Sequence, residues 1–217
     1  MIFRLISAAA IVGAMVASAA ADEKTETKAE PYKIERLIIG QKVLVDKTFA
    51  EKNETPEPSP FSITIPTGED FLTLVDAKQG GFLKVTFASP DRAFLESIHF
   101  VDMEVPSDLK DKRTPVVAKL MSETVFQNVT KDQKDAKILA IREAEVGGLG
   151  AVEVIGRYAD EKDGLIYLWI VALPHPVKSK GTYAIATIHH GRRPLTSDDE
   201  FPDSLAGRAL YSFRYTE

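Results

Sequence analysis

Cysteine is absent from this sequence of 217 residues. Its absence excludes disulfides, a catalytic thiol, cysteine-ligated zinc, iron–sulfur clusters and a lipid anchor on an N-terminal cysteine. The sequence also lacks the G-x-S-x-G turn of the common serine hydrolases and the H-E-x-x-H spacing of zinc proteases. We therefore expect no metal site and no cofactor, and no motif identifies a catalytic centre.

An excess of positive charge is absent as well. The chain has 27 Lys and Arg residues against 32 Asp and Glu residues, so its formal net charge is −5. A nucleic-acid binder normally carries a basic face or stripe, so this class of partner is not expected. The hydrophobic fraction of 44% and the charged fraction of 27% are ordinary for globular proteins, which excludes a wholly disordered chain.

The longest apolar run lies in residues 1–21. Arg4 supplies a positive start, Leu5 to Val16 is apolar and rich in alanine, and small residues follow up to Ala21. These three features are typical of a cleaved secretory signal peptide. A retained membrane anchor is the alternative, but the run is short for a bilayer span, and no later stretch approaches that length. The sequence thus predicts an exported protein, which we place in a bacterial periplasm.

Two segments of low hydrophobicity follow. Residues 22–31 are charged and lack large apolar side chains, so we expect a flexible lead. Residues 50–60 are rich in proline and predict an extended loop. Between these segments, residues 32–46 are expected to form two short strands or one bent strand. We place a single α+β domain over 32–217, with the strands and loop of 32–60 at its periphery.

Alternation of apolar and polar residues predicts a mainly antiparallel sheet. Phe61, Ile63 and Ile65 alternate with polar residues, as in a half-buried strand. Short turns separate the later strands, which favours a meander of neighbouring antiparallel strands. Further strands are expected at 82–87, 94–105, 138–146, 151–158, 165–173, 182–190 and 211–215.

Helical spacing occurs in three segments. The longest is 114–129, where Thr114 can cap the helix, Pro115 suits its first turn, and apolar residues recur every four positions. Residues 201–210 predict a short C-terminal helix. Residues 71–75 carry apolar side chains at i, i+3 and i+4, which predicts one helical turn.

This order of elements resembles the PsbP-like fold, named for an extrinsic subunit of photosystem II. The resemblance covers roughly residues 61–215. It rests on the element order and on three weak local patterns, at Phe61–Pro66, Gly147–Gly150 and Ser212–Phe213. The resemblance implies a compact α/β sandwich that usually serves as an accessory or binding module. A fold alone does not fix an activity.

A group of cationic and titratable residues follows the last strand of the meander. His189 and His190 precede Arg192 and Arg193, and arginine offers a bidentate fork for carboxylate or phosphate. These four residues predict a small anion-binding or partner-binding patch. The alternative is a solvated loop whose cations pair with the acids of 198–203 and contribute little. Adjacent histidines on a strand point to opposite faces, so a shared metal ion is not favoured.

Trp169 is the only tryptophan and lies in the most apolar predicted strand. We interpret it as a core residue or as the floor of a binding groove. Glu143, Glu145 and Glu153 could cluster across the first hairpin of the meander, and paired carboxylates can perform hydrolysis. Carboxylates on a half-exposed strand are more often solvated. The segment Gly147–Gly150 does not continue into the last glycine of the G-x-G-x-x-G motif of nucleotide-binding loops, so it predicts a hairpin turn.

Three functions follow from these patterns. The first is an exported periplasmic accessory or binding module without enzymatic activity, which presents a sheet face or the Arg192–Arg193 loop to an envelope protein. The second is a carrier of a small apolar or anionic ligand, held in a concave pocket between sheet and helix. The third is an unrecognised hydrolase that uses Glu145 or His189.

Overall fold

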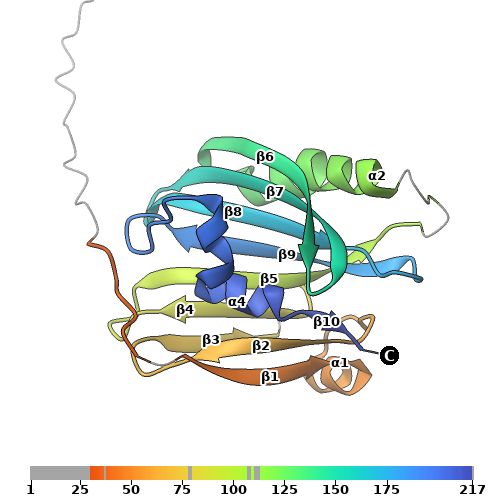
Figure 1. Ribbon diagram of the computed structural model, residues 1–217, viewed down its shortest axis with the longest axis horizontal. Coiled ribbons are helices and arrows are strands. Elements are labelled where there is room, and N and C mark those ends of the chain that lie inside the picture. The colour runs from red at the N-terminus through yellow and green to blue at the C-terminus, as the bar shows by residue number, and fades with distance from the viewer. Residues whose placement is uncertain (1–29, 37, 78–79, 107–108, 110–112, 217) are drawn as a thin grey trace, which may run out of the picture.

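The computed structural model describes residues 30–36, 38–77, 80–106, 109 and 113–216. The predicted signal peptide and most of the predicted flexible lead lie outside these residues. The helices and strands (Figure 1) are β1 (Ile39–Val45), α1 (Lys47–Asn53), β2 (Phe61–Thr67), β3 (Leu72–Asp76), β4 (Leu83–Ala88), β5 (Phe94–Glu104), α2 (Arg113–Lys119), η2 (Leu120–Val125), α3 (Phe126–Thr130), β6 (Lys134–Val146), β7 (Leu149–Asp160), β8 (Gly164–Leu173), β9 (Lys180–His189), η3 (Asp198–Asp203), α4 (Leu205–Tyr211) and β10 (Arg214–Tyr215).

The strands form two sheets. The larger sheet has the order β3-β4-β5-β9-β8-β7-β6, and the smaller one has the order β1-β2-β10. Every pairing in both sheets is antiparallel. Strands β6 to β9 form the predicted meander. The predicted α+β fold, with a mainly antiparallel sheet, is therefore confirmed.

Each face of the large sheet has its own cover (Figure 1). Elements α2, η2 and α3 run on from one another as one long helix (residues 113–130), which lies across β6, β7 and β8 on one face. Helix α4 contacts β2, β5 and β9 on the opposite face, where the small sheet also lies. The molecule is thus a sandwich with the large sheet in the middle.

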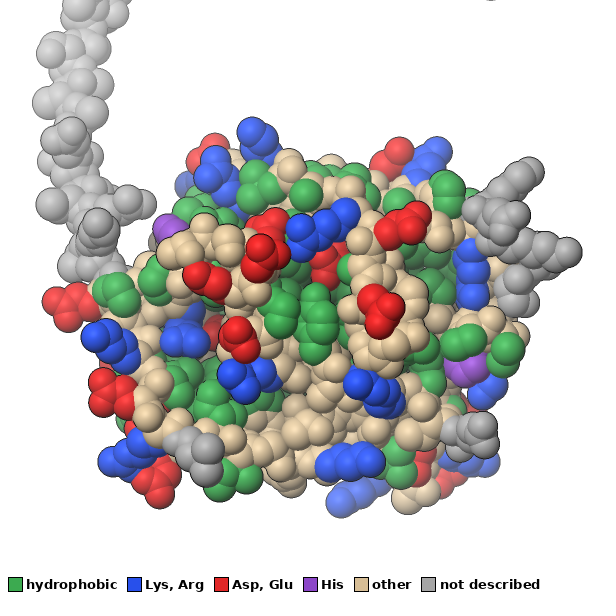
Figure 2. Space-filling model, in the orientation of Figure 1, with side chains coloured by type: hydrophobic (Ala, Val, Ile, Leu, Met, Phe, Trp, Pro, Cys, Tyr) green, Lys and Arg blue, Asp and Glu red, His purple; other side chains and the backbone are tan. Residues whose placement is uncertain are grey.

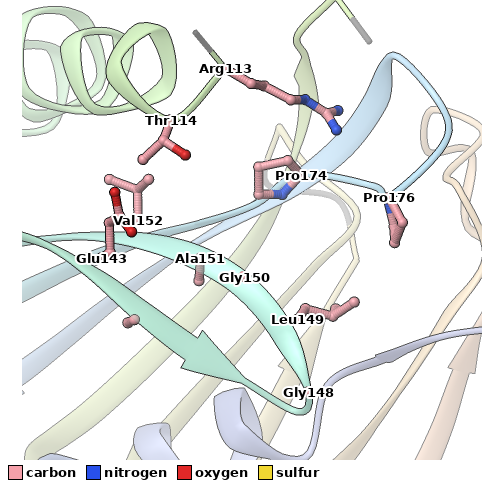
Figure 3. A pocket seen from close by; sticks show the side chains of 11 residues that line it. Arg113, Thr114, Glu143, Gly148, Leu149, Gly150, Ala151, Val152, Pro174 and Pro176 are labelled. Atoms are coloured by element: carbon pink, nitrogen blue, oxygen red, sulfur yellow. The ribbon is translucent and has the colours of Figure 1, made fainter. Parts of the chain in front are cut away.

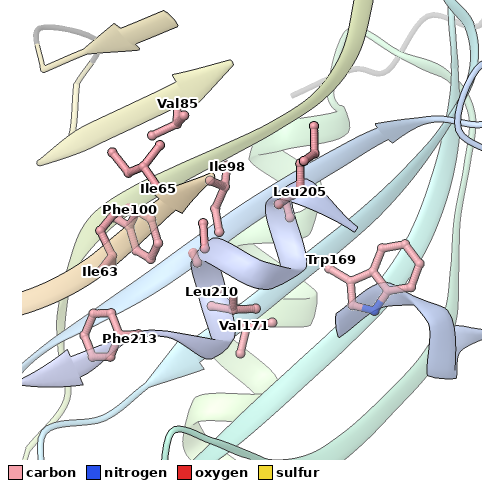
Figure 4. Packing of buried hydrophobic residues seen from close by; sticks show 14 of the residues in the cluster. Ile63, Ile65, Val85, Ile98, Phe100, Trp169, Val171, Leu205, Leu210 and Phe213 are labelled. Atoms are coloured by element: carbon pink, nitrogen blue, oxygen red, sulfur yellow. The ribbon is translucent and has the colours of Figure 1, made fainter. Parts of the chain in front are cut away.

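Two clusters of buried side chains hold these layers together. Val117, Met121 and Phe126 of the long helix pack against β7 and β8. On the other face, the ring of Phe61 from the small sheet stacks on Phe213 with centroids 4.8 Å apart. Figure 4 shows this second cluster beneath α4. The space between the large sheet and each cover is filled by these apolar side chains.

The long helix forms where the sequence predicts it, but its middle third, η2, is π-helical. Apolar residues that recur every four positions drift around an α-helix, which has 3.6 residues per turn. A π-turn is wider and reverses this drift, so Val117, Met121 and Val125 all stay buried. Val116, an apolar residue of the same helix, is 43% exposed.

The helical turn predicted at residues 71–75 is wrong, because this segment forms strand β3. Pairing with β4 joins Leu72 to Ala88 and Asp76 to Lys84. Pairing with β4 therefore decides the conformation of this segment, and the weak helical spacing of its apolar residues does not.

The loop predicted over residues 50–60 is wrong in its first residues, which belong to helix α1. The side chain of Asp46 accepts the N–H of Phe49 at 2.9 Å and caps this helix. Glu54 ends it in the left-handed conformation. Residues 32–46 contain one strand, β1, rather than two. Among the described residues, no helix has both the length and the apolar character needed to cross a bilayer.

Candidate functional site

The histidines of the proposed patch lie at the end of β9. His189 is 8% exposed, and its Nδ1 accepts the N–H of Arg192 at 3.2 Å. Burial lowers the pKa of His189, and the positive charge of Arg192 acts in the same direction. His190 lies against the ring of Tyr167, with centroids 5.0 Å apart. In the ladder between β8 and β9, His189 lies opposite Ile166, whose side chain points to the other face of the sheet from that of Tyr167. The two imidazoles therefore face opposite sides of the sheet.

Arg193 is committed to a buried ion pair. Its Nε donates to Glu96 at 3.0 Å, and Glu96 is fully buried on β5. The other oxygen of Glu96 accepts the backbone N–H of Ala206 at 2.8 Å, at the start of α4. Burial raises the pKa of Glu96 above its ordinary value, and the donors Ala206 and Arg193 offset only part of this rise. Arg193 therefore ties β5 to α4 from inside the protein.

The same loop also binds the chain's own N-terminal segment. The N–H of Tyr32 donates to the carbonyl of Arg192 at 2.7 Å. Arg193 donates to the carbonyl of Tyr32 at 3.1 Å. We name Tyr32, Glu96, Arg192 and Arg193 the Arg193 corner. The acids of 198–203 are not the partners of Arg193, because Asp198 pairs with Arg142 and Asp203 pairs with Arg208.

Trp169 lies in the core. Its side chain is 2% exposed (Figure 4). It stacks on Phe201 with ring centroids 4.4 Å apart and an angle of 7° between the rings. Its Nε1 has no hydrogen-bond partner among the described residues. This packing matches the first of the two interpretations above, and a role in binding stays a prediction.

The three glutamates of the first hairpin do not come together. Glu153 pairs across the strands with Arg142, whereas Glu143 pairs with Val152, so the two carboxylates point to opposite faces. Glu153 is 1% exposed and accepts from Arg142 Nε at 3.0 Å and from the hydroxyl of Tyr211 at 3.2 Å. Glu153 is thus a structural ion-pair partner beneath α4.

Glu143 and Glu145 are exposed on the edge strand β6. Their side chains share the face that carries the long helix, since Glu143 pairs with the buried Val152. Within the described parts of the chain, neither carboxylate has an ion pair. On the face in Figure 2, which carries α4, acidic and basic side chains lie interspersed.

The turn between β6 and β7 is the predicted hairpin. Gly147 and Gly148 have φ values of 64° and 81°, which are the left-handed values of a two-residue type I′ turn. A side chain on Gly147 would collide with the carbonyl of Phe213. Gly150 differs, because a Cβ built there meets nothing within 4 Å.

A groove opens beside this hairpin (Figure 3). It has a volume of about 460 Å³ and lies between the tip of the hairpin, the start of the long helix and the segment after β8. We name it the hairpin groove. Its lining is Arg113, Thr114, Glu143, Ala144, Gly148, Leu149, Gly150, Ala151, Val152, Pro174 and Pro176. The floor is apolar, and Arg113 and Glu143 stand on different sides of it.

Pro174 and Pro176 form one side of the groove, which we name the proline wall, and hydrogen bonds hold it in place. Arg113 donates to the carbonyl of His175 at 2.8 Å and to that of Lys178 at 3.1 Å. Nδ1 of His175 accepts the N–H groups of Val177 and Lys178 at 3.2 Å and 3.1 Å. The imidazole also packs on Tyr215, with centroids 4.6 Å apart. A wall fixed from both ends loses little entropy when it receives a ligand.

Sequence reasoning missed this groove. In the sequence, Pro174 and Pro176 signal only that the strand ends, and β8 does end at Leu173. The missed signal is the difference in length between neighbours, because β7 begins at Leu149 while its pairing with β8 begins at Val152. The hairpin tip therefore projects past β8, and the prolines line the space beside it.

The comparisons with known proteins concern the fold. No known family matches the sequence, and no curated protein matches it. Among solved structures, cyanobacterial PsbP (CyanoP) from Synechocystis is 14% identical with a TM-score of 0.46, over 85% of this chain and 98% of that one. LpqN of Mycobacterium tuberculosis, described as involved in cell envelope biogenesis, is 13% identical with a TM-score of 0.43, over 80% of this chain and 88% of that one.

A third similar structure is the Ran-binding protein Mog1p of Saccharomyces cerevisiae. It is 12% identical with a TM-score of 0.39, over 82% of this chain and 96% of that one. The PsbP-like fold that the sequence resembles is thus found among the similar solved structures. At these identities the likeness concerns the fold and carries no role for any residue.

Proposed function

We propose that this chain is an exported, periplasmic accessory or binding module without enzymatic activity, and that it binds an envelope protein through the hairpin groove. The observation that carries the proposal is the groove itself. It joins an apolar floor to polar groups at its rim, and its proline wall is fixed by Arg113 and His175. Export is supported by the sequence of residues 1–21.

The groove suits part of a protein better than a whole small molecule. It is only partly enclosed, whereas small-ligand sites bury most of their ligand. An apolar side chain of a partner fits between Leu149 and the two prolines, while the rim stays wet, as in the core and rim of protein interfaces. The carrier function is less well supported, because apolar side chains fill the space between the sheet and the long helix.

The chemistry that would be needed for hydrolysis is not gathered in the groove. Of the proposed catalytic groups, only Glu143 lines it. Glu153 is occupied by Arg142 and Tyr211, and Nδ1 of His189 accepts a backbone N–H. This distribution favours binding over catalysis.

Site-directed photo-cross-linking in intact cells tests the proposal. A photoreactive benzoylphenylalanine replaces Thr114, whose side chain points into the groove (Figure 3). The control carries the same group at Gln41, which is exposed on β1 in the other sheet. We expect one abundant envelope protein to be cross-linked from position 114 and not from position 41.

A blocking variant makes the test specific to the groove. Gly150→Trp adds a large ring at a position where a Cβ meets nothing within 4 Å, and no positive φ makes the change strained there. The adduct from position 114 should disappear in this variant, while the thermal unfolding temperature stays unchanged. Adducts that persist, or that also form from position 41, would contradict a partner site in the groove.

A further inference from the structure

The outer edge of β6 is a row of backbone groups beside the groove that has no neighbouring strand among the described residues. Strand β6 is 13 residues long and is the last strand of the large sheet. A bulge between Ile138 and Ala140 interrupts its first half. The stretch from Ala140 to Val146 is regular and pairs with β7 without interruption. A long regular edge is a template for a further strand.

The turn geometry shows which residues present their backbone to that edge. A two-residue turn closes on a hydrogen-bonded pair, here Val146 and Leu149. Hydrogen-bonded and non-hydrogen-bonded pairs alternate along an antiparallel ladder. The N–H and C=O groups of Ile141, Glu143 and Glu145 therefore point away from β7.

The side chains of the same three residues share one face of the sheet. Ile141 is 48% exposed, and Glu143 and Glu145 are exposed carboxylates without an ion pair among the described residues. An added strand would place its own alternate residues directly opposite them. The favourable partners are an apolar residue opposite Ile141 and basic residues opposite the two glutamates.

We propose that the edge of β6 binds an extended, basic segment of a partner protein by strand addition, with Lys or Arg at every second position. Main-chain hydrogen bonds supply affinity, and the paired charges select the sequence. The inference rests on the proposed function as a binding module and names the chemistry of the partner. It differs from that proposal in the surface used, since the strand is added along the outer edge of β6, where only Glu143 and Ala144 also line the groove.

The opposite face of the edge does not compete for the basic residues. Arg142 lies there, and its charge is engaged by Glu153 at 3.0 Å and by Asp198 at 3.5 Å. Ala140 and Ala144 flank it on the same face and leave room for small side chains. The partner segment is therefore expected to alternate basic residues with small polar ones.

Two synthetic peptides test this assignment against the full mature chain. The first is acetyl-Thr-Lys-Thr-Lys-Thr-Val-Thr-amide, and in the second both lysines are glutamates. Backbone amide resonances are followed by NMR during titration. The lysine peptide should shift the amides of Ala140–Val146 and bind about tenfold more tightly than the glutamate peptide, since two charge pairs change sign.

Charge reversal in the protein tests whether Glu143 and Glu145 set the preference for the lysine peptide. Glu143→Lys with Glu145→Lys should reverse the preference, so that the glutamate peptide binds more tightly. Glu51→Lys with Glu57→Lys makes the same change in net charge at α1 and its following loop, and should leave the preference for lysine intact. A preference that follows net charge in both double variants would overturn the assignment.

Other outcomes are equally informative. Equal binding of both peptides at β6, or shifts confined to Leu149 and Gly150, overturn the basic partner while leaving the groove proposal intact. No shift with either peptide also overturns it. A dimer of the free protein that dissociates in the Glu143→Lys, Glu145→Lys variant would assign the edge to a second copy instead. Loss of the cross-link from position 114 concerns the groove alone.

Discussion

The Arg193 corner and the edge of β6 use charged residues in opposite ways. In the corner, the carboxylate of Glu96 is fully buried, and its partners are Arg193 in the loop after β9 and Ala206 at the start of α4. At the edge, Glu143 and Glu145 are exposed to solvent and form no ion pair within the described residues. A buried charge is expensive unless it is paired, whereas an exposed one costs almost nothing. The corner is thus part of the fold, and the edge is free for other roles.

This contrast could not be seen in the sequence. Arg192 and Arg193 predict a patch for an outside partner, which stays a prediction, and both residues already bind Tyr32 of the same chain. Glu143 and Glu145 look like solvated charges, and their freedom is what makes the edge a candidate surface. Residue type indicates which chemistry is possible, and burial decides whether it is already used.

The largest expected effect comes from breaking the corner. Arg193→Met should lower the free energy of unfolding by about 3–5 kcal/mol, because it leaves the buried charge of Glu96 without its cation. Arg192→Met is the matched control, since the side chain of Arg192 has no ion pair among the described residues, and should change it by less than about 0.5 kcal/mol. Urea unfolding measures both.

A double variant separates pairing from burial. Glu96→Leu combined with Arg193→Met removes both charges, so it should cost less than Arg193→Met alone. If Arg192→Met and Arg193→Met destabilise the protein equally, the corner is not a structural ion pair.

Local patterns were enough to predict most of the fold. Strict alternation located β2, short polar turns located the meander of β6 to β9, and the four-residue apolar spacing located the long helix. These features depend on neighbours in sequence. The prediction of a helical turn at residues 71–75 failed, because the conformation of β3 is set by pairing with β4 and not by its own weak helical spacing.

The candidate site was much less predictable. The partner of Arg193 is 97 positions away, and no spacing in the sequence connects it to Glu96. The groove arises because β7 is longer than β8, which is a property of register. The sequence leaves Trp169 between the core and a groove floor, and only the folded chain shows that its side chain is buried. Contacts between distant segments need the folded chain.

An intermediate effect is expected at the groove wall, where His175 is a titratable group used by the fold. Burial lowers its pKa, and the positive charges of Lys178 and Arg113 act in the same direction. The unfolded chain therefore binds a proton more readily than the folded one, so stability present above about pH 6.5 is lost as the pH falls below it. His99 and His189 have lowered pKa values too and add to the same slope.

The measurement compares urea midpoints at pH 7.5, 6.5 and 5.5 for the wild type and for His175→Asn. The side-chain oxygen of asparagine can accept the N–H groups of Val177 and Lys178 but does not titrate. The variant should lose less stability on acidification than the wild type. Parallel pH profiles would show that the wall does not depend on the protonation of His175.

The smallest effect is expected at the edge itself. Glu143→Lys and Glu145→Lys, together, should change the free energy of unfolding by less than about 0.5 kcal/mol, since neither carboxylate has a partner to lose within the described residues. Urea unfolding again measures it, with Arg193→Met as the reference for a charge that the fold needs. A loss comparable with that of Arg193→Met would mean that the edge charges stabilise the sheet, and the contrast between the two regions would fail. An unchanged stability together with a reversed peptide preference would separate the two uses of charge, because the same substitution would then alter recognition and leave the fold intact.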